Sequence, residues 1–213
     1  MTVVPVDPLR ADCSRCFALC CVAPAFAASA DFAIDKPAGR PCPNLADDLR
    51  CSIHDALRPR GFAGCVVYDC FGAGQHVSQV TFGGADWRAR PGTAQQMFAV
   101  LPVVRALREL AWLVREALGL AAAVRVHPDL AVAASHLEEL TSLGAVELVT
   151  LDLARVRGSV NPVLVQASDL ARAAVRRDAP DRRGADLVGR DLRKADLRAA
   201  SLRGALLLGA DLR

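Results

Sequence analysis

Eight cysteines are the residues of this sequence best suited to chemistry, and all of them lie in its first third. Thiolates bind zinc in closed tetrahedral sites and iron in iron–sulfur clusters, and sequence spacing does not separate the two. We predict one of these cofactors here, with His54 nearby in the sequence and its role as a ligand left open. The predicted metal ligands are Cys13, Cys16, Cys20, Cys21, Cys42, Cys51, Cys65 and Cys70.

The first four cysteines have a spacing that can be tested on a helix. There Cys13, Cys16 and Cys20 would share one face, at about 0°, 300° and 340°, whereas Cys21 would stand aside near 80°. Adjacent cysteines rarely reach one ion together. The eight thiols therefore serve two centres, or one thiol of the adjacent pair only packs.

The redox environment favours metal over disulfides. Met1–Asp12 lacks a basic region followed by an apolar run, so no secretory signal is visible. The most apolar later stretch, residues 97–126, is interrupted by charged residues, which argues against a membrane span. We therefore predict a cytoplasmic protein, in which thiols stay reduced.

The elements that must position these cysteines change in character along the chain. Residues 1–91 are rich in proline and glycine and short of long apolar periodicities, so we expect a small cysteine-rich module that a metal stabilises. The glycine pairs of Gly72-Ala73-Gly74 and Gly83-Gly84 are predicted turns. His76, His127 and His136 are predicted surface or core residues.

Residues 92–178 are predicted to form a helical bundle or spacer. Thr93 is the expected N-cap of a long amphipathic helix that ends near Gly119. Further helices are expected over about 129–143, about 146–156 with a stop at Gly158, and 161–177 with Asn161-Pro162 as the start signal. Short connections favour an antiparallel arrangement.

A repeat with a period of five follows Pro180. Five residues on a helix drift by about 140° per repeat, and on a strand the repeated leucine would change face each time. A solenoid explains the period if each unit makes one side of a square coil with leucine inward. The repeated leucines are Leu187, Leu192, Leu197, Leu202, Leu207 and Leu212, preceded two residues earlier by Ala185, Ala195, Ala200, Ala205 and Ala210, with Arg190 as the exception.

These residues resemble those of pentapeptide-repeat proteins. The resemblance implies a right-handed quadrilateral β-helix over residues 185–213, with Arg190 facing outward or ending a coil. Four units make one coil in that family, so this stretch holds about one and a half coils with an open apolar end. The resemblance also implies a protein partner, or self-association through that end.

The cysteine segment resembles a second family, the zinc- or iron-chelating (YkgJ-like) cysteine-cluster domains. The matching elements are Cys13 to Cys21, Cys42-Pro43-Asn44-Leu45, Cys51-Ser52-Ile53-His54, and Arg58-Pro59 ahead of Cys65. His54 replaces the usual tyrosine, and Cys70 is extra. The resemblance implies metal binding, seen in some relatives beside a protein-methylating activity.

The predicted fold class is thus α+β and multi-domain, and the predicted function is a non-catalytic, metal-binding scaffold for protein interactions. An iron–sulfur or thiol-based redox sensor or enzyme is the alternative. Residues 172–213 carry eleven Arg or Lys against six Asp, although the whole chain has a net charge of only +3. This basic tail leaves nucleic-acid binding open and argues against DNA mimicry, which needs an acidic surface.

Overall fold

The computed structural model describes residues 7–213 and divides the chain into two compact units. The first unit comprises the chain up to Leu113 together with Ala134–Gly158. The second comprises Val114–Ala133 and Ser159–Arg213. The three-part division predicted from the sequence, at 1–91, 92–178 and 185–213, stays a prediction.

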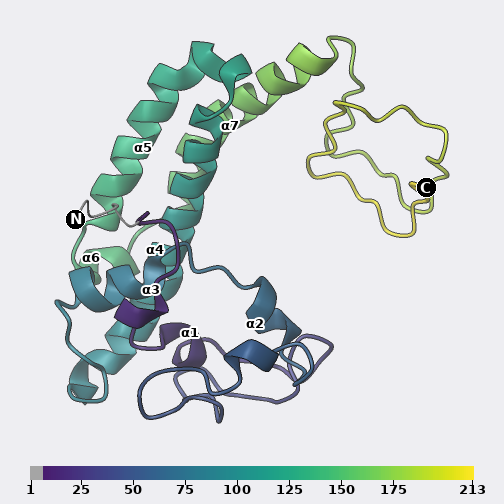
Figure 1. Ribbon diagram of the computed structural model, residues 1–213. Helices are drawn as coiled ribbons and strands as arrows, with labels where there is room; N and C mark the ends of the chain where they lie inside the picture. Colours follow the sequence, from purple (N-terminus) through teal and green to yellow (C-terminus); the bar gives the residue numbers. More distant parts are fainter. Residues whose placement is uncertain (1–6) are drawn as a thin grey trace, which may run out of the picture. The chain divides into compact units, whose positions relative to one another are not determined.

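Short elements make up the cysteine segment, and longer helices follow it (Figure 1). The short ones are η1 (Cys13–Arg15), α1 (Leu19–Val22), η2 (His54–Ala56), α2 (Ala63–Val67), α3 (Ala73–His76) and η3 (Val77–Thr81). The later ones are α4 (Pro91–Leu118), η4 (Ala121–Val126), α5 (His127–Thr141), α6 (Ala145–Val149) and α7 (Leu153–Val175).

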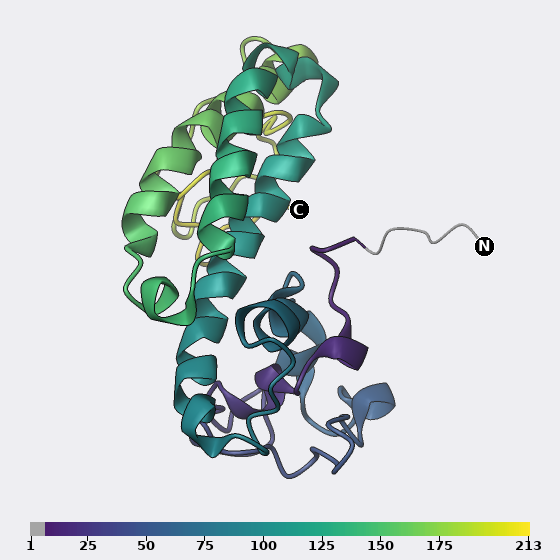
Figure 2. The same cartoon turned by 90° about the vertical axis from the view of Figure 1, so that its left-hand side faces the viewer.

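Helix α4 confirms the long amphipathic helix, with a different start. It begins at Pro91, which suits the first turn, and the Thr93 hydroxyl donates to the Arg90 carbonyl oxygen at 2.8 Å, inside the helix. Its apolar face is buried at Met97, Val100, Leu101, Val104, Leu107 and Val114. Helix α5 runs back alongside α4 in both views (Figures 1 and 2), and buries Leu130 and Leu137.

The two helices expected after Gly144 have other boundaries. Helix α6 ends at Val149, and α7 runs without a break through both Gly158 and Asn161-Pro162, the expected stop and start signals. Val156, Val160, Val163 and Ala167 are buried at helical spacing along α7. Burial of this continuous face outweighs the local cost of about 1 kcal/mol for an interior glycine and the loss of one amide donor at Pro162.

The predicted α+β class and C-terminal quadrilateral β-helix are wrong. The described residues are helical and contain no β-sheet, and residues 181–213 contain no strand. This segment forms turns joined by three isolated parallel bridges: Asp181 to Ser201, Asp186 to Leu206 and Asp191 to Asp211. Each bridged pair is twenty residues apart, so the chain returns beside itself after four units. A turn follows every bridge, so hydrogen bonding does not extend into a ladder.

The five-residue period still decides which side chains of this segment are covered. Leu187 is buried, the repeated leucines from Leu192 to Leu207 are half-buried, and Arg190 is exposed. Leu212, expected to point inward, is 54% exposed. Figure 1 shows this part of the chain as an open coil of loops.

Candidate functional site

The adjacent pair Cys20-Cys21 lies on α1, a helix of a single turn. Its N-cap residue, Ala18, has a left-handed backbone conformation with φ of 55°. This conformation prevents η1 and α1 from forming one continuous helix. The single helical face considered for Cys13, Cys16 and Cys20 is therefore absent. The Sγ atoms of Cys20 and Cys21 lie 4.0 Å apart.

Polar side chains of α3 and η3 hold the loop that carries Cys13 and Cys16. The Gln75 amide donates to the Arg10 carbonyl oxygen at 2.7 Å, and the Gln79 amide donates to the Arg15 carbonyl oxygen at 2.8 Å. The Ser78 hydroxyl accepts from the Phe17 amide at 3.0 Å. These bonds join residues more than sixty positions apart and fix the first cysteines against α3.

Two glycines bring α3 close to this loop and to Cys70. A Cβ at Gly74 would lie 2.7 Å from the Sγ of Cys16 and 4.0 Å from that of Cys70, so both thiols face this glycine. Gly72 has φ of 76°, and a Cβ there would lie 2.1 Å from the Pro8 carbonyl oxygen. The segment Gly72-Ala73-Gly74, predicted as a turn, is thus the start of helix α3. Its glycines lack a Cβ and so allow the N-terminal loop and the cysteine thiols to approach the backbone closely.

Electrostatics identifies which thiols are neighbours in this part of the segment. Burial raises the pKa of Cys13, and the thiolates of Cys20 and Cys70 raise it further. Burial also raises the pKa of Cys16 to about 12, again with contributions from Cys20 and Cys70. We call Cys13, Cys16, Cys20 and Cys70 the first thiol group.

The remaining four cysteines are linked through the loops between α1 and α2. The Cys42 amide donates to the Cys21 carbonyl oxygen at 3.0 Å, and the Leu45 amide donates to the Cys42 carbonyl oxygen at 2.9 Å. Leu45 in turn forms an antiparallel bridge with Cys51. Burial raises the pKa of Cys65 to about 11, with contributions from the Cys20, Cys42 and Cys51 thiolates. We call Cys21, Cys42, Cys51 and Cys65 the second thiol group, although the Cys20 thiolate of the first group also acts on Cys65.

Lys36 fixes the loop that joins Cys21 to Cys42. It is 4% exposed, and its Nζ donates to the carbonyl oxygens of Val22, Pro24, Pro37 and Arg40 at 2.5 to 3.2 Å. The ammonium also lies 4.7 Å from the centroid of the Phe26 ring. Burial lowers the pKa of Lys36, and the Cys42 and Cys21 thiolates oppose that change. Lys36 therefore ties together the backbone of the loop between Cys21 and Cys42.

The eight thiols lie in one compact unit, but their side chains do not point toward a common position. Within residues 7–213, no group of three or more His, Cys, Asp or Glu side chains is arranged so that it could hold a metal ion. Cys13 is exposed, Cys42 is buried, and the other six are intermediate. His54 is exposed on η2. A shared ion would require cysteine side chains to change rotamer about their single χ1 bond.

Raised thiol pKa values bear on the alternative of thiol catalysis. The hydrogen bond to Cys21 raises the pKa of Cys20, and burial adds to this increase. Catalytic cysteines have lowered pKa values, because the thiolate is the nucleophile. The described cysteines whose pKa shifts therefore lack the activation that a nucleophile needs.

Sequence reasoning missed a buried polar network around His76. The His76 Nε2 lies 3.0 Å from the Thr141 carbonyl oxygen, and its Nδ1 lies 2.6 Å from the Nη2 of buried Arg108. Arg108 also donates to the Pro8 carbonyl oxygen at 2.6 Å. Spacing could not reveal this cluster, because its members come from α3, α4, α5 and the N-terminal loop.

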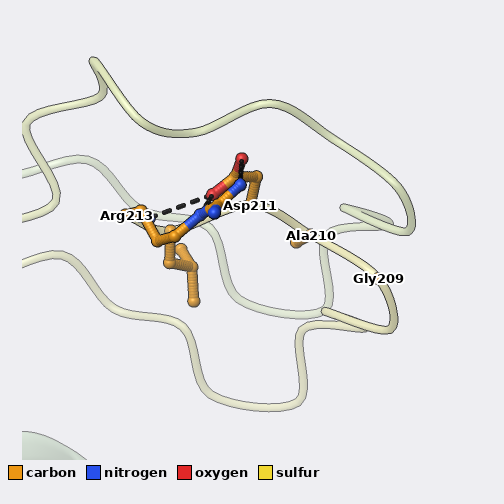
Figure 3. A pocket seen from close by; sticks show the side chains of 5 residues that line it. Gly209, Ala210, Asp211 and Arg213 are labelled. Carbon is orange, nitrogen blue, oxygen red and sulfur yellow. Dashed lines mark hydrogen bonds and ion pairs between the residues drawn. The ribbon is translucent and has the colours of Figure 1, made fainter.

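Half of the eight Arg and Lys residues in residues 181–213 pair with an aspartate two residues earlier. An aspartate accepts from the arginine two residues later in Asp181–Arg183, Asp191–Arg193, Asp196–Arg198 and Asp211–Arg213. Figure 3 shows the last pair at a pocket lined by Gly209–Arg213. This pairing reduces the cationic surface that nucleic acid would need.

Comparison with known proteins supports the repeat and leaves the cysteine segment open. Residues 183–213 match the family described as Pentapeptide repeats (8 copies), so the chain carries pentapeptide repeats there. The chain is 49% identical over 168 residues to the uncharacterised protein YybG of Bacillus subtilis (strain 168). The match covers 79% of this chain and 60% of that relative, so the chain spans less than two thirds of its length.

No solved structure matches the chain. The resemblance of the cysteine segment to chelating domains stays a prediction. Among the described helices, none has the length and apolar character needed to cross a membrane.

Proposed function

We propose that the protein is a non-catalytic scaffold with two parts. The cysteine segment binds metal through its thiolates, as zinc or as an iron–sulfur cluster, and the pentapeptide repeats contact a protein partner. The observation that carries the metal part is the gathering of all eight thiols, from six short segments, within one compact unit. Thiolates are the soft ligands that these metals prefer.

The electrostatic surroundings support a cation in this segment. Burial and mutual repulsion oppose ionisation of Cys13, Cys16 and Cys65, so a bound cation would be needed to stabilise several thiolates together. Metal would also hold loops that have little core of their own, since few of their side chains are buried.

The repeat segment supports the interaction part of the proposal. Leu206, Leu208 and Leu212 are 54–75% exposed, and apolar surface of this kind is typical of contact with another protein. The aspartate–arginine pairs favour a protein over nucleic acid, because they leave less uncompensated charge.

The test is a metal analysis of protein purified without oxygen. We expect zinc, or iron with a near-equal amount of sulfide and a brown colour, in a fixed ratio to the chain. A variant with all eight cysteines changed to serine is the control and should contain none. Equal, substoichiometric metal in both proteins would overturn the metal part of the proposal.

A further inference from the structure

One side of the repeat segment lacks the arginines that its other sides carry. The residue after a repeated leucine is valine or leucine in two units, at Val188 and Leu208, and arginine in the other four. Val188 is 50% exposed and Leu208 is 75% exposed. Leu206, which stands where most units have an aspartate, is 55% exposed. The charged pattern of the repeat is therefore interrupted by three exposed apolar side chains.

The coil brings these three residues together. The Gly189 amide donates to the Leu208 carbonyl oxygen at 2.9 Å, so Val188 and Leu208 lie beside each other in successive turns of the coil. Leu206 forms a parallel bridge with Asp186 and so adjoins the same place. We call Val188, Leu206 and Leu208 the apolar strip. Exposed apolar side chains that lie together in this way are typical of an interface.

Two charges of opposite sign flank the apolar strip. Asp186 precedes Val188 by two residues, and its side chain accepts from the Val188 amide at 3.1 Å. Arg190 follows Val188 by two residues and is exposed. Within residues 7–213, neither Asp186 nor Arg190 forms an ion pair. Along this turn of the coil the outer surface thus reads negative, apolar, positive.

We propose that the apolar strip docks onto the same strip of a second copy of this chain, side by side. A rotation of 180° about an axis parallel to the coil axis reverses the order of the surface. Asp186 of each copy then meets Arg190 of the other, while Val188 and Leu208 meet the same residues of the second copy. This inference rests on the proposed contact of the repeats with a protein partner, and it names that partner.

The fit of side-chain sizes supports the same pairing in the next turn of the coil. Leu206 and Ala210 have the same separation in sequence as the two flanking charges, so the rotation brings Leu206 of one copy opposite Ala210 of the other. Ala210 is small, and it adjoins the pocket lined by Gly209–Arg213 (Figure 3). A large apolar side chain therefore meets a small uncharged one, with room beside it.

The test is sedimentation velocity of the full chain as purified, in reductant and over a series of concentrations. We expect wild-type protein to dimerise as its concentration rises. Val188→Arg/Leu208→Arg restores the arginine of the other units and should raise the dissociation constant by about tenfold or more, because like charges then face each other. The matched control is Val132→Arg/Val146→Arg, on exposed positions of α5 and α6, which should keep the wild-type dimer.

Charge reversal tests the twofold pairing itself. Asp186→Arg and Arg190→Asp should each weaken the dimer, because two like charges then meet in each symmetric pair. An equimolar mixture of these two variants should associate again, because each reversed charge then faces one of opposite sign. The mixture also controls for folding, since a disrupted coil could not restore the contact.

Two results would overturn the inference. One is wild-type protein that stays monomeric over the whole series, and the other is a dimer that persists in Val188→Arg/Leu208→Arg. Both leave the metal part of the proposed function and a contact with a different protein intact. A dimer that contains no metal would instead overturn the metal part alone. If the double arginine variant aggregates, the mixture of the two charge variants decides.

Discussion

At the scale of single residues, His76 couples proton binding to stability. Burial and the Arg108 guanidinium lower its pKa from 6.5, and these outweigh the Thr141 carbonyl and the charge of Glu138, which raise it. The neutral ring accepts from Arg108 and donates to Thr141, so protonation removes the acceptor. The folded state therefore takes up this proton less readily than the unfolded chain.

We predict that the free energy of unfolding falls as the pH drops below about 6.5, because only the unfolded state then gains the proton. Urea unfolding at pH 7.5, 6.5 and 5.5 measures the slope. His76→Gln, whose amide can make both bonds, should flatten it. The matched control is His136→Gln at an exposed position, which should keep the wild-type slope. Equal slopes in both variants would contradict this role of His76.

Lys36 gives a second residue-scale prediction. Lys36→Met leaves four carbonyl oxygens without their shared donor, and an unsatisfied buried polar group costs about 1–3 kcal/mol. We expect a loss of that order in the unfolding free energy of the first unit. Lys194→Met, at the exposed second lysine of the chain, is the control and should change stability by less than about 0.5 kcal/mol. Equal effects in both variants would show that the hydrogen bonds from Lys36 to the four carbonyl oxygens contribute nothing to stability.

At the scale of elements, two helical glycines should respond to alanine with opposite signs. Gly74→Ala places a methyl group 2.7 Å from the Cys16 Sγ, and overpacking of this kind costs about 1–3 kcal/mol. Gly158 is exposed inside α7 with nothing within 4 Å of its Cβ position, so Gly158→Ala should stabilise by about 0.5–1 kcal/mol. Thermal unfolding of both variants against wild type is the measurement. The same sign for both would contradict the close packing at Gly74.

The elements also show what the sequence could predict. Regular apolar spacing identified α4 and α5 to within two residues, because those helices bury one continuous face. Local signals failed at Gly158 and Pro162, where a buried face along α7 outweighs them. The five-residue period identified the repeat but did not predict its hydrogen bonding. The structure has isolated bridges there in place of the expected strands.

The candidate site was predictable in composition and not in arrangement. The sequence identified all eight cysteines as candidate metal ligands. It also indicated that the adjacent residues Cys20 and Cys21 rarely bind one ion together. It could not show that Ala18 breaks the helix, that Gly74 faces two thiols, or that Lys36 closes the loop between Cys21 and Cys42. Those features arise from contacts between residues far apart in the chain, and such contacts produce no regular spacing in the sequence.

At the scale of the whole molecule, the division into two units makes a prediction about metal removal. All eight thiols belong to the first unit, and the pentapeptide repeats belong to the second. Metal bound to the native state alone stabilises the unit that holds it. A chelator should therefore speed amide hydrogen exchange in residues 13–82 and leave the amides of the repeat unchanged.

The amides to follow in the repeat are those of Arg182, Leu187 and Leu192, each of which donates to a carbonyl oxygen nineteen residues ahead. In the cysteine segment they are those of Cys42 and Leu45, which bond within the second thiol group. The all-serine variant is the control, because a chelator should not alter its exchange. Faster exchange in both units would mean that the repeat depends on the metal centre for its fold, whereas no change in residues 13–82 would mean that metal does not support this segment.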